Sequence, residues 1–170
     1  ITVWNVVMMA RTRQLGWLRR PGAAAKAIVN EALDRVGMLD LKDRRIGELS
    51  GGQQQRVFLA RALAQQADLF LFDEPFTGVD KKTEAVLLEI FGELRTAGKI
   101  LLVSTHEWGK SLSQLEREAR HQGGRILLIN HRLIADGSPD QVMTPANLQQ
   151  AYGVSLHQHT YRDNGADLFC

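Results

Sequence analysis

The order of apolar and polar positions predicts three amphipathic helices. Apolar residues recur three and four positions apart over residues 21–36, after residue 52, and from Asp80 to Ala97. Pro21 and Asp80 are residue types that begin helices, and Gly37 and Gly98 are typical stops. The side chains expected to face inward are Ile28, Val29, Ala32, Leu33 and Val36, then Phe58, Leu59, Ala62 and Leu63, and finally Val86, Leu87, Ile90 and Leu94.

Two predicted strands lie on either side of the third predicted helix: residues 69–72, an unbroken apolar run, and residues 100–104, which are apolar up to Ser104. Runs this short are typical of parallel strands that are buried on both faces. The order strand, helix, strand predicts a βαβ unit, whose crossover connection makes the two strands parallel. We therefore expect a fold of the α/β class.

The remainder of the chain predicts shorter elements. A helix is expected over about residues 109–120, followed by a β-hairpin of residues 125–130 and 132–137 that turns at Asn130-His131. Two short helices are each expected to begin at a proline and the second to end at a glycine; these residues are Pro139, Pro145 and Gly153. Residues 154–170 are polar and predict a surface tail, whose two histidines lack a third metal ligand nearby.

Composition narrows the possible functions. The chain has 170 residues, of which 44% are apolar, so it is long enough to bury a core. Cys170 is the single cysteine, which excludes a disulfide framework and argues against a cysteine zinc site. The net charge of +2 is too small to indicate nucleic-acid binding. Four arginines within residues 11–20 form either a solvated helix face or a surface that lies near phospholipid or an acidic partner.

The first candidate for chemistry is the sequence Ser50-Gly51-Gly52 at the start of a predicted helix. Glycines there let the backbone approach a ligand, and the free N–H groups and the helix dipole favour an anion. An ordinary capped helix start explains the same residues, and both interpretations stay open at this point.

The second candidate is the acid pair that follows the first predicted strand. Asp73 and Glu74 are expected at the carboxyl edge of the parallel sheet, where α/β proteins bind ligands. Adjacent acids are costly there unless a cation offsets their repulsion, so one can hold magnesium and the other can orient a water. A helix-capping pair is disfavoured because Pro75 follows at once. His106 is expected at the same edge, either as a functional residue or as an ordinary surface or core histidine.

Together these features resemble the ATP-binding cassette (ABC) ATPase family. Residues 49–53 (LSGGQ) look like its signature motif, residues 69–75 (LFLFDEP) like its Walker B strand, residues 77–80 (TGVD) like its D-loop, and residues 104–106 (STH) like its switch histidine. The motifs stand in family order, and the resemblance extends from residue 1 to about residue 153. It implies a partial P-loop NTPase (RecA-like) fold with a helical signature subdomain.

The resemblance also implies a role for individual residues. Asp73 would hold Mg2+, Glu74 would act as the general base, and His106 would contact the γ-phosphate of ATP. Asp80 would help to join two subunits. A second group, expected to bind the ATP held by a neighbouring subunit, consists of Ser50, Gly51, Gly52 and Gln53.

The same resemblance implies a domain division and partners. Residues 1–48 would form part of the helical subdomain, residues 49–153 the signature helix and the C-terminal half of the ATPase core, and residues 154–170 the tail. Residues 1–21 and 137–153 look most like ATPase subunits of manganese, zinc and iron importers. The implied partners are a second ABC ATPase subunit, in a head-to-tail dimer, and a transmembrane permease, with the protein at the cytoplasmic face of the cell membrane. No nucleic acid is expected.

Two family motifs are absent from the 170 residues, the phosphate-binding loop and the glutamine of the Q-loop. The phosphate-binding Walker A loop, G-x-x-x-x-G-K-[ST], does not occur, and the near-matches at residues 92–99 and 109–111 fail in spacing or in neighbouring residues. We therefore expect the C-terminal portion of a longer ATPase, or a truncated copy that binds ATP weakly and exposes sheet edges and apolar surface. Two alternatives remain: a non-catalytic interaction module, and an ABC ATPase of a soluble machine, which the compact helical segment before Ser50 disfavours.

Overall fold

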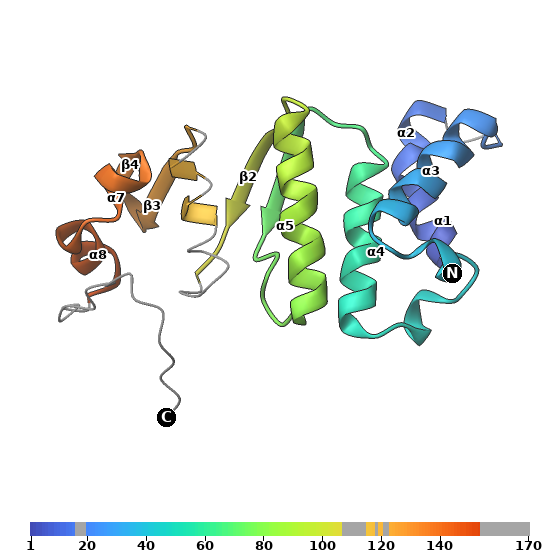
Figure 1. Cartoon of the computed structure of the whole chain (residues 1–170), viewed down its shortest axis with the longest axis horizontal. Coiled ribbons are helices and arrows are strands. Elements are labelled where there is room, and N and C mark those ends of the chain that lie inside the picture. Colours follow the sequence, from blue (N-terminus) through green and yellow to red (C-terminus); the bar gives the residue numbers. More distant parts are fainter. Residues whose placement is uncertain (16–19, 107–114, 118, 121–122, 154–170) are drawn as a thin grey trace. The chain divides into compact units, whose positions relative to one another are not determined.

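The structure is a computed structural model that describes residues 1–15, 20–106, 115–117, 119–120 and 123–153 (Figure 1). The chain divides into two compact units, Ile1–Glu107 and Trp108–Cys170. The domain boundaries expected near residues 48 and 153 stay predictions. Within the described residues, no helix combines the length and the apolar character needed to cross a membrane.

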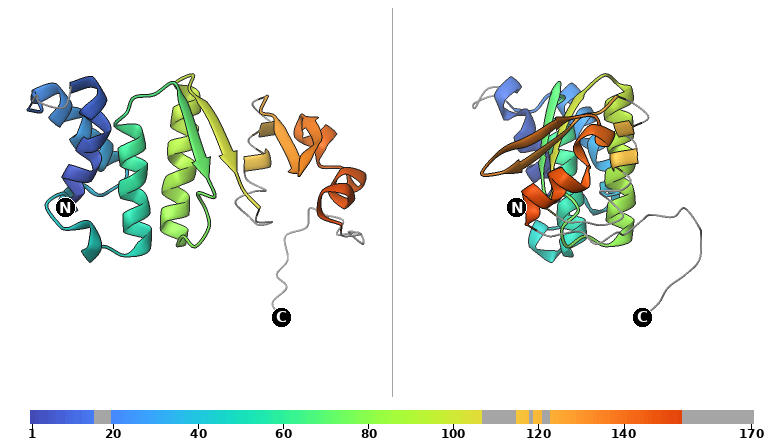
Figure 2. Two further views of the ribbon diagram at one scale, coloured as in Figure 1. Left: turned by 180° about the vertical axis from the view of Figure 1, so that it is seen from behind. Right: turned by 90° about the vertical axis from the view of Figure 1, so that its left-hand side faces the viewer.

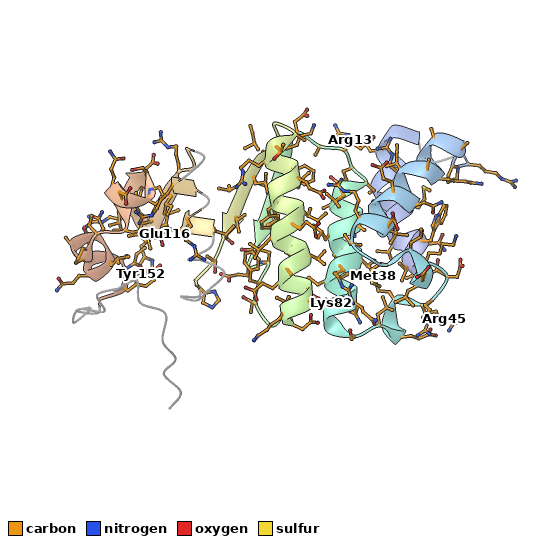
Figure 3. All side chains as sticks on the ribbon, in the orientation of Figure 1. Arg13, Met38, Arg45, Lys82, Glu116 and Tyr152 are labelled. Carbon is orange, nitrogen blue, oxygen red and sulfur yellow. The ribbon has the colours of Figure 1, made fainter. Side chains whose placement is uncertain are left out.

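The first unit begins with a group of helices. These are α1 (Val3–Met8), η1 (Met9–Arg11), α2 (Thr12–Leu15), α3 (Ala23–Arg35), η2 (Leu39–Leu41), η3 (Ile46–Glu48) and α4 (Gly51–Leu63). Helices α1, α3 and α4 pack on one another (Figure 1). The chain leaves α3 through Gly37, whose φ is +64°, and the next side chain, Met38, is buried (Figure 3). The helix predicted from Pro21 thus starts at Ala23, with Gly22 as its N-cap.

The buried face of α4 differs from the prediction. Phe58, which was expected to face inward, has 51% of its surface exposed. Val57 and Ala60 are buried instead, together with the correctly predicted Leu59 and Leu63. Helix α4 contacts the α1–α3 group as well as α5, so more of its surface is covered than the single face that the sequence predicts (Figure 2). Val57 and Ala60 lie in this covered part.

The predicted βαβ unit is confirmed. Strands β1 (Leu69–Asp73) and β2 (Ile100–Ser104) are parallel, and α5 (Lys81–Thr96) connects them. Their register pairs Leu69 with Ile100 at one end and Asp73 with Ser104 at the other. Helix α5 has the predicted buried positions Leu87, Ile90 and Leu94, and Asp80 is its N-cap as expected.

One face of this sheet is open, so burial on both faces was a wrong prediction for these strands. Side chains alternate between the two faces of a strand. Phe72 faces α5 and packs against Phe91, with ring centroids 4.6 Å apart and ring planes tilted by 41°. On the opposite face, four apolar side chains are at least half exposed, namely Leu69, Leu71, Ile100 and Leu102. The expectation of exposed apolar surface is therefore confirmed.

The second unit contains the predicted hairpin and the two short helices. Strands β3 (Ile126–Asn130) and β4 (Arg132–Gly137) are antiparallel, followed by α7 (Pro139–Val142) and α8 (Pro145–Tyr152). Leu128, Val142, Leu148 and Ala151 form its core. Residues 115–117 and 119–120 are helical, in agreement with the predicted helix, whereas its first half and the tail of residues 154–170 lie outside the described residues.

Candidate functional site

The carboxyl ends of β1 and β2 bring the acid pair and Ser104 together. Asp73 and Ser104 are register partners, so their side chains lie on the same face of the sheet. The Ser104 hydroxyl donates a hydrogen bond to Asp73 Oδ1. This face is the open one, which leaves Asp73 accessible to a ligand at the edge of the sheet.

Glu74 leaves the strand in a strained turn that several contacts hold. Its φ of +50° is in the left-handed region, which costs a residue other than glycine about 1–3 kcal/mol. Its backbone N–H donates to the Ser104 carbonyl oxygen at 3.1 Å, and its Oε2 accepts from the Thr77 hydroxyl at 3.2 Å. Strain of this kind persists where the surroundings determine the conformation, and it is common at functional sites.

His106 lies beside the Glu74 carboxylate, at the sheet edge where the sequence predicts it. Its Nδ1 is 2.5 Å from Glu74 Oε1, so the ring N–H donates to the carboxylate. The imidazole is largely exposed, with 73% of its side-chain surface accessible, whereas the Glu74 side chain is 30% exposed. An imidazole hydrogen-bonded to a carboxylate at an open edge has the geometry to pass a proton to or from a bound substrate or water.

Ser50, Gly51 and Gln53 form a separate group at the start of α4. The Ser50 hydroxyl oxygen accepts from the Gln53 N–H at 3.3 Å, and the Gln53 side-chain oxygen accepts from the Ser50 N–H at 3.0 Å. This capping box shows that the ordinary structural interpretation of Ser50 is correct. It is compatible with anion binding as well, because the hydroxyl that accepts from Gln53 still has its own hydrogen to donate.

Gly52 lies against the start of α5. A Cβ atom at this position would be 2.5 Å from Asp80 Oδ2 and 2.9 Å from Thr83 Oγ1, which is too close for a side chain. Glycine therefore allows the first turn of α4 to pack on the N-cap of α5. The Asp80 carboxylate accepts from the Thr83 backbone N–H at 2.8 Å, and this hydrogen bond is the main reason why the pKa of Asp80 is lower than usual.

Sequence analysis assigned no individual role to Ser104, Thr77 or Gln55, although the side chains of all three make contacts at the end of β1 or in the segment that follows it. The Gln55 side-chain N–H donates to the Pro75 carbonyl oxygen at 2.7 Å. The register of the two strands was the available signal for Ser104, since residues that end neighbouring parallel strands lie side by side. No local pattern pointed to Gln55.

The donor atoms near Asp73 suit magnesium. Asp73 and Ser104 offer only oxygen atoms, which are the ligands that Mg2+ prefers, and a protein commonly supplies one or two carboxylates while phosphates and waters supply the rest. The described residues contain no group of three or more histidine, cysteine or acidic side chains that could hold a metal by themselves. The site therefore fits a metal ion that arrives with a phosphate ligand.

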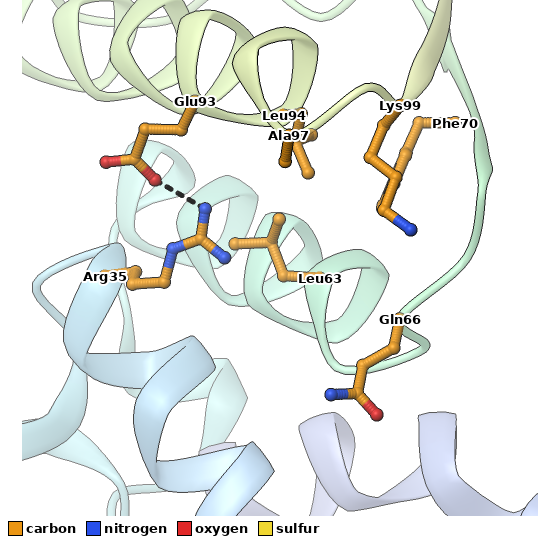
Figure 4. A pocket seen from close by; sticks show the side chains of 8 residues that line it. All are labelled: Arg35, Leu63, Gln66, Phe70, Glu93, Leu94, Ala97 and Lys99. Atoms are coloured by element: carbon orange, nitrogen blue, oxygen red, sulfur yellow. Dashed lines mark hydrogen bonds and ion pairs between the residues drawn. The ribbon is translucent and has the colours of Figure 1, made fainter.

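A cavity of about 250 Å³ lies in the same unit but apart from these residues (Figure 4). Phe70 and Lys99, at the beginnings of β1 and β2, contribute to its lining, so it lies toward the opposite end of the strands from Glu74. Its charged side chains are paired, Arg35 with Glu93 at 2.5 Å and Lys99 with Asp68 at 2.6 Å. It does not contribute to the candidate site.

Comparison with protein families and curated proteins gives consistent matches. The family model described as "ABC transporter" matches residues 2–77. The chain is 46% identical over 153 residues to the chelated iron transport system membrane protein YfeB of Yersinia pestis, covering 90% of this chain and 49% of that protein. It is 43% identical over 162 residues to the manganese transport system ATP-binding protein MntA of Synechocystis, covering 93% of this chain and 59% of that protein. The chain thus spans about half of the length of these relatives.

Solved structures give the same fold. A metal-chelate type ABC transporter in an inward-facing conformation superposes with a TM-score of 0.75 at 24% identity, covering 90% of this chain and 58% of that one. An ATP-binding cassette of an ABC transporter in its ADP conformation superposes with a TM-score of 0.66 at 21% identity, covering 89% of this chain and 62% of that one. The predicted fold class, a partial ABC-type P-loop ATPase fold, is confirmed.

Proposed function

Because the chain belongs to the ABC transporter family, we propose that it is the part of an ATP-hydrolysing subunit that carries the signature motif and the catalytic base. The observation that supports this most strongly is the Glu74–His106 pair at the carboxyl edge of β1 and β2. The work of the subunit would be to power the import of a metal ion through a membrane permease. Relatives named for manganese, zinc and chelated iron transport support that substrate class.

In the proposed reaction, Glu74 is the general base. A water oxygen forms a bond to the γ-phosphorus of ATP while the bond from that phosphorus to the bridging oxygen of ADP breaks, and the Glu74 carboxylate takes the proton of the water. In the present geometry, His106 occupies Glu74 Oε1 and Thr77 occupies Oε2. Binding of the γ-phosphate would draw the exposed imidazole away from Oε1 and leave that oxygen for the water.

Asp73 and Ser104 would hold the magnesium ion that accompanies ATP. When bound, Mg2+ supplies positive charge that offsets the charge on the phosphate oxygens. The residues themselves act by position. The Ser104 hydroxyl donates to the Asp73 carboxylate, and its carbonyl oxygen accepts from the Glu74 N–H. Ser104 thereby orients the Asp73 carboxylate toward the metal while it holds the backbone of Glu74, whose carboxylate acts on the water.

The start of α4 would bind ATP that a second subunit holds. Ser50 and Gly51 are exposed there, and the first N–H groups of a helix favour an anion. We propose that this group, together with Gly52 and Gln53, contacts the γ-phosphate in a head-to-tail dimer, and that Asp80 lies at the subunit junction. The assembly would sit at the cytoplasmic face of the membrane, against the permease.

The test is ATP turnover by the gene product that contains this chain. Glu74→Gln should lower kcat by at least about a hundred-fold, because a general base contributes roughly 10²–10⁴ in rate. ATP binding by the variant should be retained, since Glu74 acts on the water. Equal turnover by the two proteins would remove Glu74 from this role. A wild-type protein that docks to its partners without turnover would instead support a non-catalytic module.

A further inference from the structure

Three consecutive glutamines on α4 make different contacts. The side chains of Gln53 and Gln54 bond back to the start of their own helix, at the Ser50 N–H and at the Leu49 carbonyl oxygen. The Gln55 side chain leaves the helix and donates to the Pro75 carbonyl oxygen at 2.7 Å. Gln55 therefore links α4 directly to the residue that follows Glu74.

This hydrogen bond holds the strained turn from its far side. Hydrogen bonds hold the backbone on both sides of Glu74, whose φ is +50°. Its own N–H donates to the Ser104 carbonyl oxygen, and the carbonyl oxygen of the next residue, Pro75, accepts from Gln55. Pro75 is buried, so its carbonyl oxygen has little access to water as an alternative partner. Without the Gln55 donor, the Pro75 carbonyl would lose its side-chain partner, and the turn would be held only by the Ser104 carbonyl and by the Thr77 N–H that donates to the Glu74 carbonyl oxygen at 3.2 Å. A shift of Pro75 would then carry the neighbouring Glu74 with it.

Helix α4 also contacts the other end of the same loop. Gly52 packs against Asp80 and Thr83 at the start of α5. The first two turns of α4 thus touch the chain at Pro75 and at Asp80, on both sides of the segment between Glu74 and α5. A displacement of the start of α4, where Ser50 lies, would reach Glu74 through Gln55.

We infer that Gln55 is a positioning residue that fixes the turn carrying Glu74 and couples it to the helix that begins at Ser50. The inference rests on the proposed function, since it assigns Gln55 a role through the general base. Gln55 does not itself act on the reacting atoms. Its loss should therefore lower kcat and leave the KM for ATP nearly unchanged.

The test replaces one side-chain nitrogen by oxygen. In the gene product that contains this chain, Gln55→Glu removes the N–H donor and should lower kcat by roughly ten-fold or more, because misplacing a catalytic group by about 1 Å can cost 10²-fold. Gln149→Glu, the same change at an exposed position of α8, is the matched control and should keep the wild-type kcat. Gln55→Leu removes the donor without adding charge and should reproduce the loss.

A second measurement does not depend on turnover. Hydrogen exchange of a peptide covering residues 71–79 should be faster in Gln55→Glu and in Gln55→Leu, while a peptide covering residues 84–96 of α5 keeps its exchange rate. Unchanged exchange in residues 71–79 would overturn the inference. General acceleration in both peptides would also overturn it, because it would mean that Gln55 supports the whole unit.

The Glu74→Gln background separates this inference from the proposed function. If Gln55 acts through Glu74, then Gln55→Glu should lower the residual turnover of Glu74→Gln by less than two-fold, a smaller loss than in the wild-type background. If the loss of kcat in the double variant equals the product of the two single losses, Gln55 does not act through Glu74. If Glu74→Gln alone keeps normal turnover, the proposed function fails, whereas a loss in Glu74→Gln with normal kcat in Gln55→Glu refutes only the role of Gln55.

Discussion

The Ser104 hydroxyl donates a hydrogen bond to the carboxylate of Asp73, its register partner across the two parallel strands. The same serine accepts the Glu74 N–H through its carbonyl oxygen, at 3.1 Å. One residue of β2 therefore orients both acids at the end of β1. This geometry makes Ser104 a supporting residue for any cation that Asp73 binds.

Ser104→Ala should weaken the response of ATP turnover to magnesium. Loss of the hydroxyl removes the contact that orients Asp73, and the loss of a supporting partner commonly costs about ten-fold or more in metal affinity. The Mg2+ concentration for half-maximal turnover should rise accordingly, as measured by titration with Mg2+ at saturating ATP. Thr96→Ala, which removes an exposed hydroxyl from α5, is the control. Identical titrations for Ser104→Ala and wild type would contradict the assignment.

His106→Asn should lower kcat by about ten-fold or more, because it removes both the partner of Glu74 and the side chain proposed to meet the γ-phosphate. The matched control is His131→Asn at the hairpin turn of the second unit. His131 has a φ of +54°, and asparagine tolerates this left-handed conformation. The kcat of each variant is measured from steady-state ATP turnover. Equal kcat values for the two variants would exclude a catalytic role for His106.

Gly52→Ala should destabilise the fold by about 1–3 kcal/mol, since the new methyl group overlaps the Asp80 carboxylate and forces a local shift. Gly51→Ala is the informative comparison, because nothing lies within 4 Å of a Cβ at that position. Alanine is favoured over glycine in a helix, so Gly51→Ala should be neutral or slightly stabilising. Urea unfolding monitored by circular dichroism measures both. A similar effect of the two substitutions would mean that α4 does not pack on Asp80 as described.

The Asp80 cap should make stability depend on pH in the acid range. The pKa of Asp80 is lowered in the folded state, chiefly because its carboxylate accepts the Thr83 N–H. The ionised form therefore stabilises the fold at pH values above the unfolded pKa of about 3.9, and this contribution is lost as the pH falls through the lower folded value. The difference in Tm between wild type and Asp80→Asn should shrink below about pH 4. A difference that stays constant from pH 3 to pH 7, roughly the span on either side of that pKa, would be inconsistent with this cap.

The open face of the sheet should tolerate substitution in this chain. Leu71 is 68% exposed, so Leu71→Thr should change the free energy of unfolding by no more than about 0.5 kcal/mol. Phe91 of α5 is 2% exposed and packs on Phe72. Phe91→Ala should therefore lower the free energy of unfolding by about 3–5 kcal/mol. Chemical unfolding of both variants measures the contrast. A large loss for Leu71→Thr would show that this face is covered in solution.

The helices and strands could be predicted because their signals are local. The Asp80 cap, the stop at Gly98 and the apolar runs before Asp73 and Ser104 act within a few residues, and the structure has each element close to its predicted place. The position of His106 near the acid pair could also be expected, since parallel strands end at a common edge. Of the site, the sequence therefore predicted the residues that end the strands.

The contacts between distant residues were decided by the tertiary structure. The element types, the helix caps and the order of the motifs follow from residues close together along the chain. Only packing determined that Phe58 faces outward, that the sheet has one open face, and that Gln55 reaches Pro75. The physical reason is that helical or strand periodicity sets which side chains share a face, whereas the neighbour that covers this face comes from segments far away along the chain.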